Sequence, residues 1–178
     1  MPNKIELYTR IEGYEHRLGH VYIGFHERFK DRPELARFWS EAAFEEMQHG
    51  AILRFCRENG NFSNDTVDDA LCNRIESLID TVASVAKKPD LSVDEAFYAS
   101  LLVEASELDD VYARLTGGLL PDHRLLYESI RANLRSHHEQ FSEAAGRFLS
   151  DPAFVAAFSN LSSKHPDHRN AQINPGDK

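Results

Sequence analysis

The chain has 178 residues, of which 42% are hydrophobic and 28% are charged, and its formal net charge at pH 7 is -9. This length suits one globular domain with a substantial core and is short for two. The acidic balance argues against nucleic acid or an anionic membrane as a partner, because both are themselves negatively charged.

The amino-terminal segment has no apolar stretch of the kind found in secretion signals, and the sequence has no run of about 18 apolar residues that would span a membrane. We therefore expect a soluble, cytoplasmic protein. The two cysteines, Cys56 and Cys72, lie far apart, which excludes the closely spaced pairs typical of zinc ribbons, thioredoxin-like motifs and iron–sulfur sites.

In the first third of the chain, apolar residues recur every three or four positions, which is the period of an α-helix. They predict one helix over residues 5–30 and a second over residues 33–58. Asp31 is a candidate cap for the second helix, and Pro33 fits its first turn. Because the connection is short, the two helices are predicted to form an antiparallel hairpin.

A further helical pattern follows over residues 71–85 and ends before Lys87, Lys88 and Pro89. No titratable residue interrupts its apolar positions. We interpret this helix as a crossover that returns the chain to the far end of the molecule, so that the next two long helices pack against the first hairpin.

The sequence Ser92–Glu95 is a capping box that opens the third long helix, which is predicted to continue unbroken to Gly117 and Gly118. Pro121 and Asp122 are predicted to start the fourth long helix, which runs to about residue 149.

The end of the chain is predicted to differ from the long helices. Asp151 and Pro152 begin a short apolar helix that reaches Leu161 and covers one end of the molecule. Residues 162–178 are polar and show no apolar period, which predicts a disordered tail. The domain is therefore expected to occupy residues 1–161.

Each long helix carries a titratable residue at a position where its period calls for an apolar one. These residues are Glu15, Glu46 with His49, Glu104 followed by Glu107, and His137. Several carboxylates in one dry core repel one another unless a cation neutralises them, so their pattern predicts a divalent metal site. Oxygen-rich ligands with two imidazoles favour iron or manganese over zinc.

The pattern resembles the ferritin-like superfamily, specifically the rubrerythrin-type di-iron domain, over residues 5–149. The matching residues are Glu15 with Tyr22, Glu46-x-x-His49, Glu104-x-x-Glu107 with Tyr112, and His137-x-x-x-Phe141. The resemblance implies an all-α, ferritin-like four-helix bundle with a helical crossover between helices 2 and 3 and a short C-terminal helix. It also implies metal ligation by Glu15, Glu46, His49, Glu104 and His137, with Glu107 as an additional carboxylate.

The fourth long helix departs from the family pattern. Such proteins carry Glu three residues before the histidine, and this chain has Leu134 before His137, or Arg135 before His138. The apolar spacing favours His137 as the ligand, but neither choice restores the Glu. Three alternatives follow: two iron ions with one bridge lost, a single metal ion, or no metal with Arg135 as counter-ion to the acids.

The resemblance implies a non-haem iron oxidoreductase, peroxidase-like or ferroxidase-like, that reacts with peroxide or dioxygen or oxidises ferrous iron. Full rubrerythrins carry a four-cysteine domain that delivers electrons, so peroxide turnover here calls for a separate electron-donor protein. Bundles of this type often form homodimers. The alternative is a ferritin-like binding or structural module with a degenerate site, in which Tyr22 and Tyr112 are core residues whose hydroxyls bind a carboxylate.

Overall fold

The computed structural model describes residues 3–119 and 122–163, and within these ranges all regular structure is helical. The elements are α1 (Lys4–Arg28), α2 (Pro33–Glu58), α3 (Asp69–Ala86), α4 (Val93–Glu104), α5 (Leu108–Thr116), the 3-10 helix η1 (Gly117–Leu119), α6 (Arg124–Phe148) and α7 (Pro152–Ser163). The all-α class predicted from the sequence is confirmed. None of the described helices combines the length and the apolar character that a membrane span needs.

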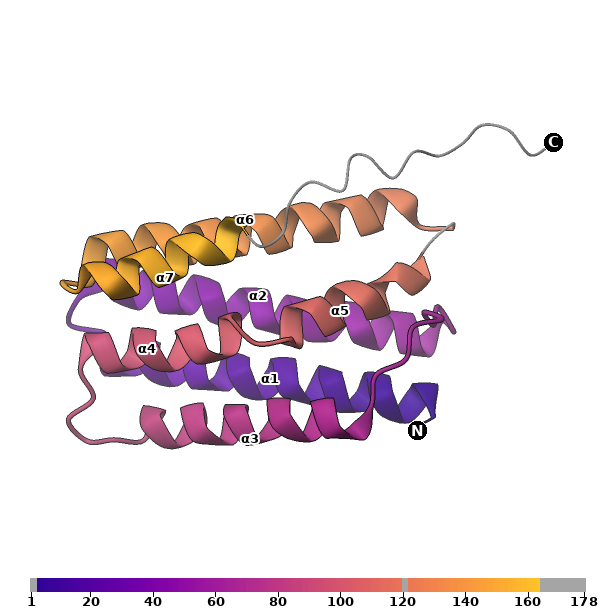
Figure 1. Ribbon diagram of the computed structural model, residues 1–178, viewed down its shortest axis with the longest axis horizontal. Helices are drawn as coiled ribbons and strands as arrows, with labels where there is room; N and C mark the ends of the chain where they lie inside the picture. The colour runs from indigo at the N-terminus through magenta and orange to yellow at the C-terminus, as the bar shows by residue number, and fades with distance from the viewer. Residues whose placement is uncertain (1–2, 120–121, 164–178) are drawn as a thin grey trace.

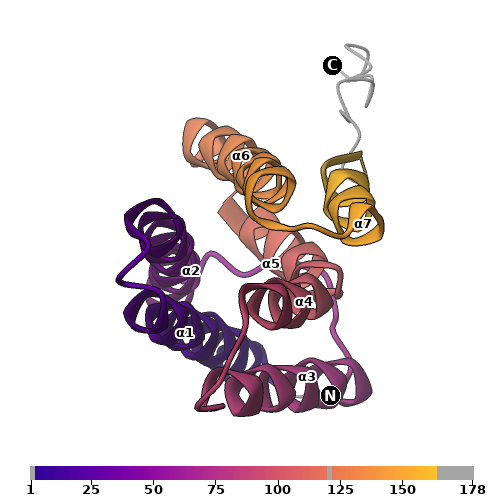
Figure 2. The same cartoon turned by 90° about the vertical axis from the view of Figure 1, so that its left-hand side faces the viewer.

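The helices lie nearly along one axis of the molecule (Figure 1). α1 and α2 form an antiparallel hairpin, and α3 runs back along the molecule, so that α4 and α5 follow the same direction as α2. α6 then returns antiparallel to α4 and α5, and α7 folds back against it. In the end-on view of Figure 2, α3 lies outside α1 and α4, and α7 lies outside α6 and α4.

The helix boundaries follow local capping in some places and correct the sequence prediction in others. The capping box of α4 is confirmed, because the Ser92 hydroxyl accepts from the Glu95 amide and the Glu95 carboxylate accepts from the Ser92 amide. α2 starts at Pro33 as expected, but its cap residue is Arg32 rather than Asp31. α6 starts at Arg124 and not at Pro121 or Asp122; residues 120–121 lie outside the described part.

The third long helix is broken, which the sequence prediction missed. α4 ends at Glu104 and α5 begins at Leu108, with Ala105, Ser106 and Glu107 forming a turn between them. The Ser106 hydroxyl accepts a hydrogen bond from the Leu108 amide at 3.2 Å and so caps the start of α5. The turn contains neither Gly nor Pro, so the sequence carries no signal for the break.

An aromatic cluster fills the core on one side of the break. Trp39 of α2 is fully buried and packs against Phe25, Phe38, Phe97 and Phe141, with ring centroids 4.7–6.2 Å apart. α7 contributes Phe158, whose ring lies 5.9 Å from that of Phe141. α7 therefore covers the core as predicted, although it continues to Ser163 rather than ending at Leu161. Residues 164–178 of the predicted tail lie outside the described residues.

Candidate metal centre

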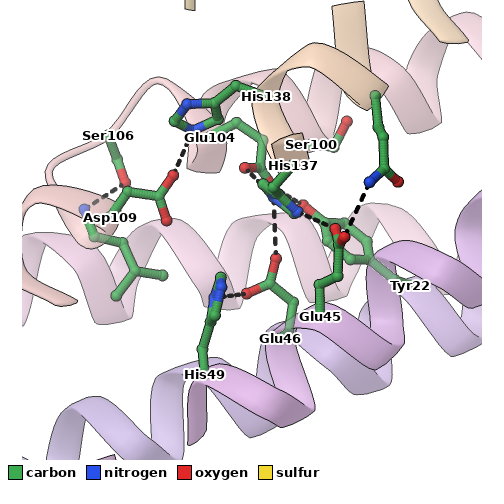
Figure 3. Close-up of polar contacts among 12 residues, drawn as sticks. Tyr22, Glu45, Glu46, His49, Ser100, Glu104, Ser106, Asp109, His137 and His138 are labelled. Carbon is green, nitrogen blue, oxygen red and sulfur yellow. Dashed lines mark hydrogen bonds and ion pairs between the residues drawn. The ribbon is translucent and has the colours of Figure 1, made fainter. Parts of the chain in front are cut away.

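Five of the six predicted ligands meet in the interior, and they come from four different helices. They form two groups that share Glu46: Glu15, Glu46 and His49, and Glu46, Glu104 and His137. Within each group one ligand atom per residue lies within 4.8 Å of the others, and every member is buried. Figure 3 shows Glu46 between His49 and His137.

A glycine allows α1 to approach α2 beside this cluster. Gly19 lies one helical turn after Glu15, and a Cβ atom at this position would lie 3.2 Å from the Ala43 carbonyl oxygen and 3.5 Å from the Glu46 Cβ. The absent side chain therefore lets the two backbones pack closely at the level of Glu46. This close approach brings the carboxylates of Glu15 and Glu46 to the same imidazole.

In the first group, His49 lies between two acids. Its Nδ1 is 3.3 Å from Glu46 Oε2 and 3.7 Å from Glu15 Oε2. Glu15 is fully buried, and neither of its carboxyl oxygens has a hydrogen-bond partner among the described residues. Burial accordingly raises the pKa of Glu15 well above its usual value. Glu15 is thus a buried acid without a hydrogen bond among the described residues, and it lies 3.7 Å from the imidazole of His49.

In the second group, both ring nitrogens of His137 face carboxylates. Nε2 is 2.9 Å from Glu104 Oε2 and 3.5 Å from Glu46 Oε1, while Nδ1 is 2.5 Å from Glu45 Oε2. A carboxylate on the outer nitrogen of an imidazole fixes the ring so that the other nitrogen points inward. Glu45 performs this function and was missed by the sequence analysis, because its helical position faces the boundary rather than the core.

The two tyrosines of the predicted motif behave differently. The Tyr22 hydroxyl donates to Glu104 Oε1, which confirms the expected pairing with a carboxylate. The ring of Tyr112 lies 4.4 Å from that of His49, but its hydroxyl has no hydrogen-bond partner in the described part of the chain.

The buried acids and imidazoles shift one another's pKa values. Burial lowers the pKa of His49, but the neighbouring carboxyl groups of Glu15 and Glu46 outweigh it and raise that pKa to about 10. Burial likewise opposes ionisation of Glu46, yet contacts with His49 and His137 outweigh it and lower the pKa of Glu46. These pairs of imidazolium and carboxylate hold protons that a metal ion must displace.

Glu107 is not part of the cluster, which corrects the prediction for the sixth ligand. It lies in the turn between α4 and α5, its side chain is 56% exposed, and its carboxylate faces Arg74 at 3.7 Å. The prediction assumed an unbroken helix, in which residues three apart share a face. The break at residues 105–107 removes that relationship and leaves Glu107 at the surface.

Asp109, which the sequence did not indicate, and His138, which it indicated only as the alternative to His137, both lie in the interior of the site. Asp109 and His138 are 8% and 2% exposed, and His138 Nε2 is 2.6 Å from Asp109 Oδ2. Burial would raise the pKa of Asp109, but the contact with His138 outweighs it and lowers that pKa to about 2. With Glu104 they form a third group of closely spaced ligand atoms.

The expected alternatives on α6 are also resolved in part. Both His137 and His138 are buried, so burial does not decide which of the two is the ligand. Leu134 is a buried apolar residue. Arg135 is exposed, whereas the imidazoles lie directly against the acids.

An open surface groove of about 420 Å³ lies between α2 and α6. It is lined by Glu41, Phe44, Glu45, Gln48 and Gln140. Glu45 accepts from Gln140 Nε2 at 3.1 Å and from His137 at its other oxygen. Glu45 therefore borders the groove and also contacts the buried His137.

No family model, curated protein or solved structure matches this chain.

Proposed function

We propose that the buried cluster binds iron and that the protein is a non-haem iron protein of rubrerythrin or ferritin-like type. The observation that carries this proposal is Glu15, a fully buried carboxyl group that faces Glu46 and His49 and has no hydrogen-bond partner in the described residues. Buried polar groups normally form hydrogen bonds, and a carboxyl group that forms none in a cluster of possible ligands is explained by a cation.

The donor set fits this group. Four buried carboxylates, those of Glu15, Glu46, Glu104 and Asp109, carry four negative charges when ionised, and two divalent cations bring four positive charges. The imidazoles of the same groups remain neutral as ligands. No cysteine belongs to these groups in the described part of the chain, and this mixture of oxygen and imidazole donors favours iron or manganese over structural zinc.

Bound ferrous iron would supply electrons to peroxide or dioxygen. The protein's own residues prepare that chemistry: carboxylates stabilise the ferric state, and Glu45 holds a proton at His137 Nδ1 so that Nε2 faces the acids. The aromatic cluster around Trp39 excludes water on one side. Reduction of peroxide in repeated turnovers requires a separate electron-donor protein, whereas oxidation of iron does not.

The arrangement of helices supports the same assignment to a ferritin-like bundle. α3 returns the chain along the molecule, so that α2 and the α4–α5 pair run in one direction and each hairpin contributes ligands (Figure 1).

A metal-free module is the second candidate, and a specific contact favours it. His137 bonds directly to Glu104 and Glu45, so part of the cluster is already compensated by imidazole, and Leu134 supplies no carboxylate. Glu15 is the residue that this alternative leaves unexplained.

The test is iron content after anaerobic loading with ferrous iron and removal of excess. We expect about two iron ions per chain, from the charge balance of paired ligands. Glu46→Ala should bind fewer iron ions than the unaltered chain, and Glu27→Gln, an exposed acid on α1, should bind as many. Near-absence of iron in the unaltered chain would favour the metal-free module.

The reaction itself is tested on the loaded protein. We expect peroxide to oxidise the ferrous protein faster than dioxygen does in stopped-flow measurements. The reverse order would favour iron oxidation as the physiological activity.

A further inference from the structure

We infer that the second metal ion is held by Glu104, Asp109 and His138, and that this group replaces the site that the fourth-helix Glu would complete. The inference rests on the proposed function, because it assigns ligands within the same cluster. It concerns a ligand pair, Asp109 and His138, that the family resemblance does not provide.

The three groups of ligand atoms form a chain with shared members. The first group, Glu15, Glu46 and His49, and the third group have no residue in common. The middle group takes Glu46 from the first and Glu104 from the third, and adds His137. Two ions in the outer groups therefore do not compete for a residue, whereas an ion in the middle group removes a carboxylate from each neighbour.

The outer groups also have the same composition. Each consists of two buried carboxylates and one buried imidazole, which balances the charge of one divalent cation. His137 belongs only to the middle group and has a different function from His49 and His138. Its Nε2 contacts one carboxylate of each outer group, Glu104 at 2.9 Å and Glu46 at 3.5 Å, so it links the two sites.

The break in the third long helix is what creates the third group. In an unbroken helix, Asp109 would be rotated by about 140° from Glu104 around the axis and could not share its face. The turn at residues 105–107 reorients the chain, and Figure 3 shows Asp109 directed at His138 close to Glu104. The same turn moves Glu107 to the surface, so the break exchanges one acid for another.

Through this exchange, Asp109 of α5 supplies the carboxylate that α6 lacks at Leu134. Leu134 provides no carboxylate to the histidine that follows it, and Asp109 provides one from α5 at 2.6 Å from His138 Nε2. Both His137 and His138 are buried, because the cluster contacts α6 over more than one face. A carboxylate and imidazole pair is thus restored at the second position by residues from two different helices.

The experiment counts bound metal in single-residue variants, using Mn²⁺ or Fe²⁺ alone as the probe. We expect two ions per chain in the unaltered protein and one in Asp109→Asn, in His138→Gln and in Glu15→Gln. The double variant Glu15→Gln/Asp109→Asn should bind none. Asp110→Asn, an exposed neighbour of Asp109, is the matched control and should bind two.

His137→Gln separates this inference from the expected family arrangement. It should retain two ions, because His137 belongs to neither outer group. The inference is overturned if His137→Gln binds one ion while Asp109→Asn and His138→Gln still bind two. It is also overturned if the unaltered chain binds a single ion, a result that leaves metal binding itself intact. Absence of metal from the unaltered chain would instead reject the proposed function.

Folding is monitored in each variant by far-ultraviolet circular dichroism. If Asp109→Asn does not fold, His138→Gln carries the same test, because it removes the imidazole of the third group and leaves every carboxylate in place. The electron paramagnetic resonance spectrum of bound Mn²⁺ provides a second readout. Coupling between two ions should disappear in both variants and persist in Asp110→Asn.

Discussion

Replacing Glu15 by methionine should stabilise the metal-free protein while removing an ion from the first group. The carboxyl group is fully buried, burial raises its pKa well above the usual value, and both of its oxygens lack hydrogen-bond partners among the described residues. An unpaired buried polar group costs about 1–3 kcal/mol. Methionine has nearly the same length and no such requirement, so it should recover most of this free energy.

The expected gain of about 1–3 kcal/mol corresponds to a rise in Tm of about 2–12 °C for a domain of this size. The measurement is thermal unfolding by circular dichroism in chelator, so that only the metal-free state is compared. A site that is destabilising without its ion is typical of functional residues, which trade stability for activity.

Glu12→Met is the matched control, because Glu12 lies on the same helix and is also buried. Its Oε1 accepts from Arg54 Nε at 2.7 Å, and its Oε2 lies 2.7 Å from Arg57 Nη1. Removing this compensated acid takes one carboxylate away from two guanidinium groups and should lower Tm. If Glu15→Met lowers Tm by as much as Glu12→Met, then Glu15 is compensated in the metal-free protein and the reasoning fails.

The remaining predictions concern backbone packing and protons. Gly19→Ala should weaken metal affinity, because its Cβ meets the Ala43 carbonyl at 3.2 Å, while Gly13→Ala, with no contact within 4 Å, should leave affinity unchanged in calorimetry. Gly118→Ala places a Cβ 2.3 Å from the backbone oxygen of Asn61 and should cost about 1–3 kcal/mol or more of unfolding free energy. Gly117→Ala meets nothing and should leave the denaturant midpoint unchanged. Metal affinity should rise between about pH 6 and pH 9, because His49 has a pKa of about 10 and must lose its proton before it binds a metal ion. A chelator competition that shows no pH dependence would contradict this prediction.

The sequence pattern located much of the site because most ligands lie in continuous helices. Glu15, Glu46 and His49 follow the 3.6-residue period of α1 and α2, and Glu104 is the last residue of α4. Each could therefore be assigned to the interior from the apolar residues that precede it.

The prediction failed where the backbone leaves that period. The turn after Glu104 contains only Ala, Ser and Glu, residues that are compatible with a helix, so the exchange of Glu107 for Asp109 depends on tertiary packing. The sequence favoured His137 over His138 as the ligand, because two adjacent residues of a helix point in different directions and only one of them continues the row of apolar residues. The close approach at Gly19 likewise depends on the partner helix, which the sequence of α1 does not contain.

Anomalous scattering at the iron edge, measured from crystals loaded with ferrous iron, would reveal whether metal ions occupy the interior of this protein. We expect two anomalous peaks, one among Glu15, Glu46 and His49 and one among Glu104, Asp109 and His138. Crystals that take up iron only at surface acids, with no peak among these buried residues, would contradict it.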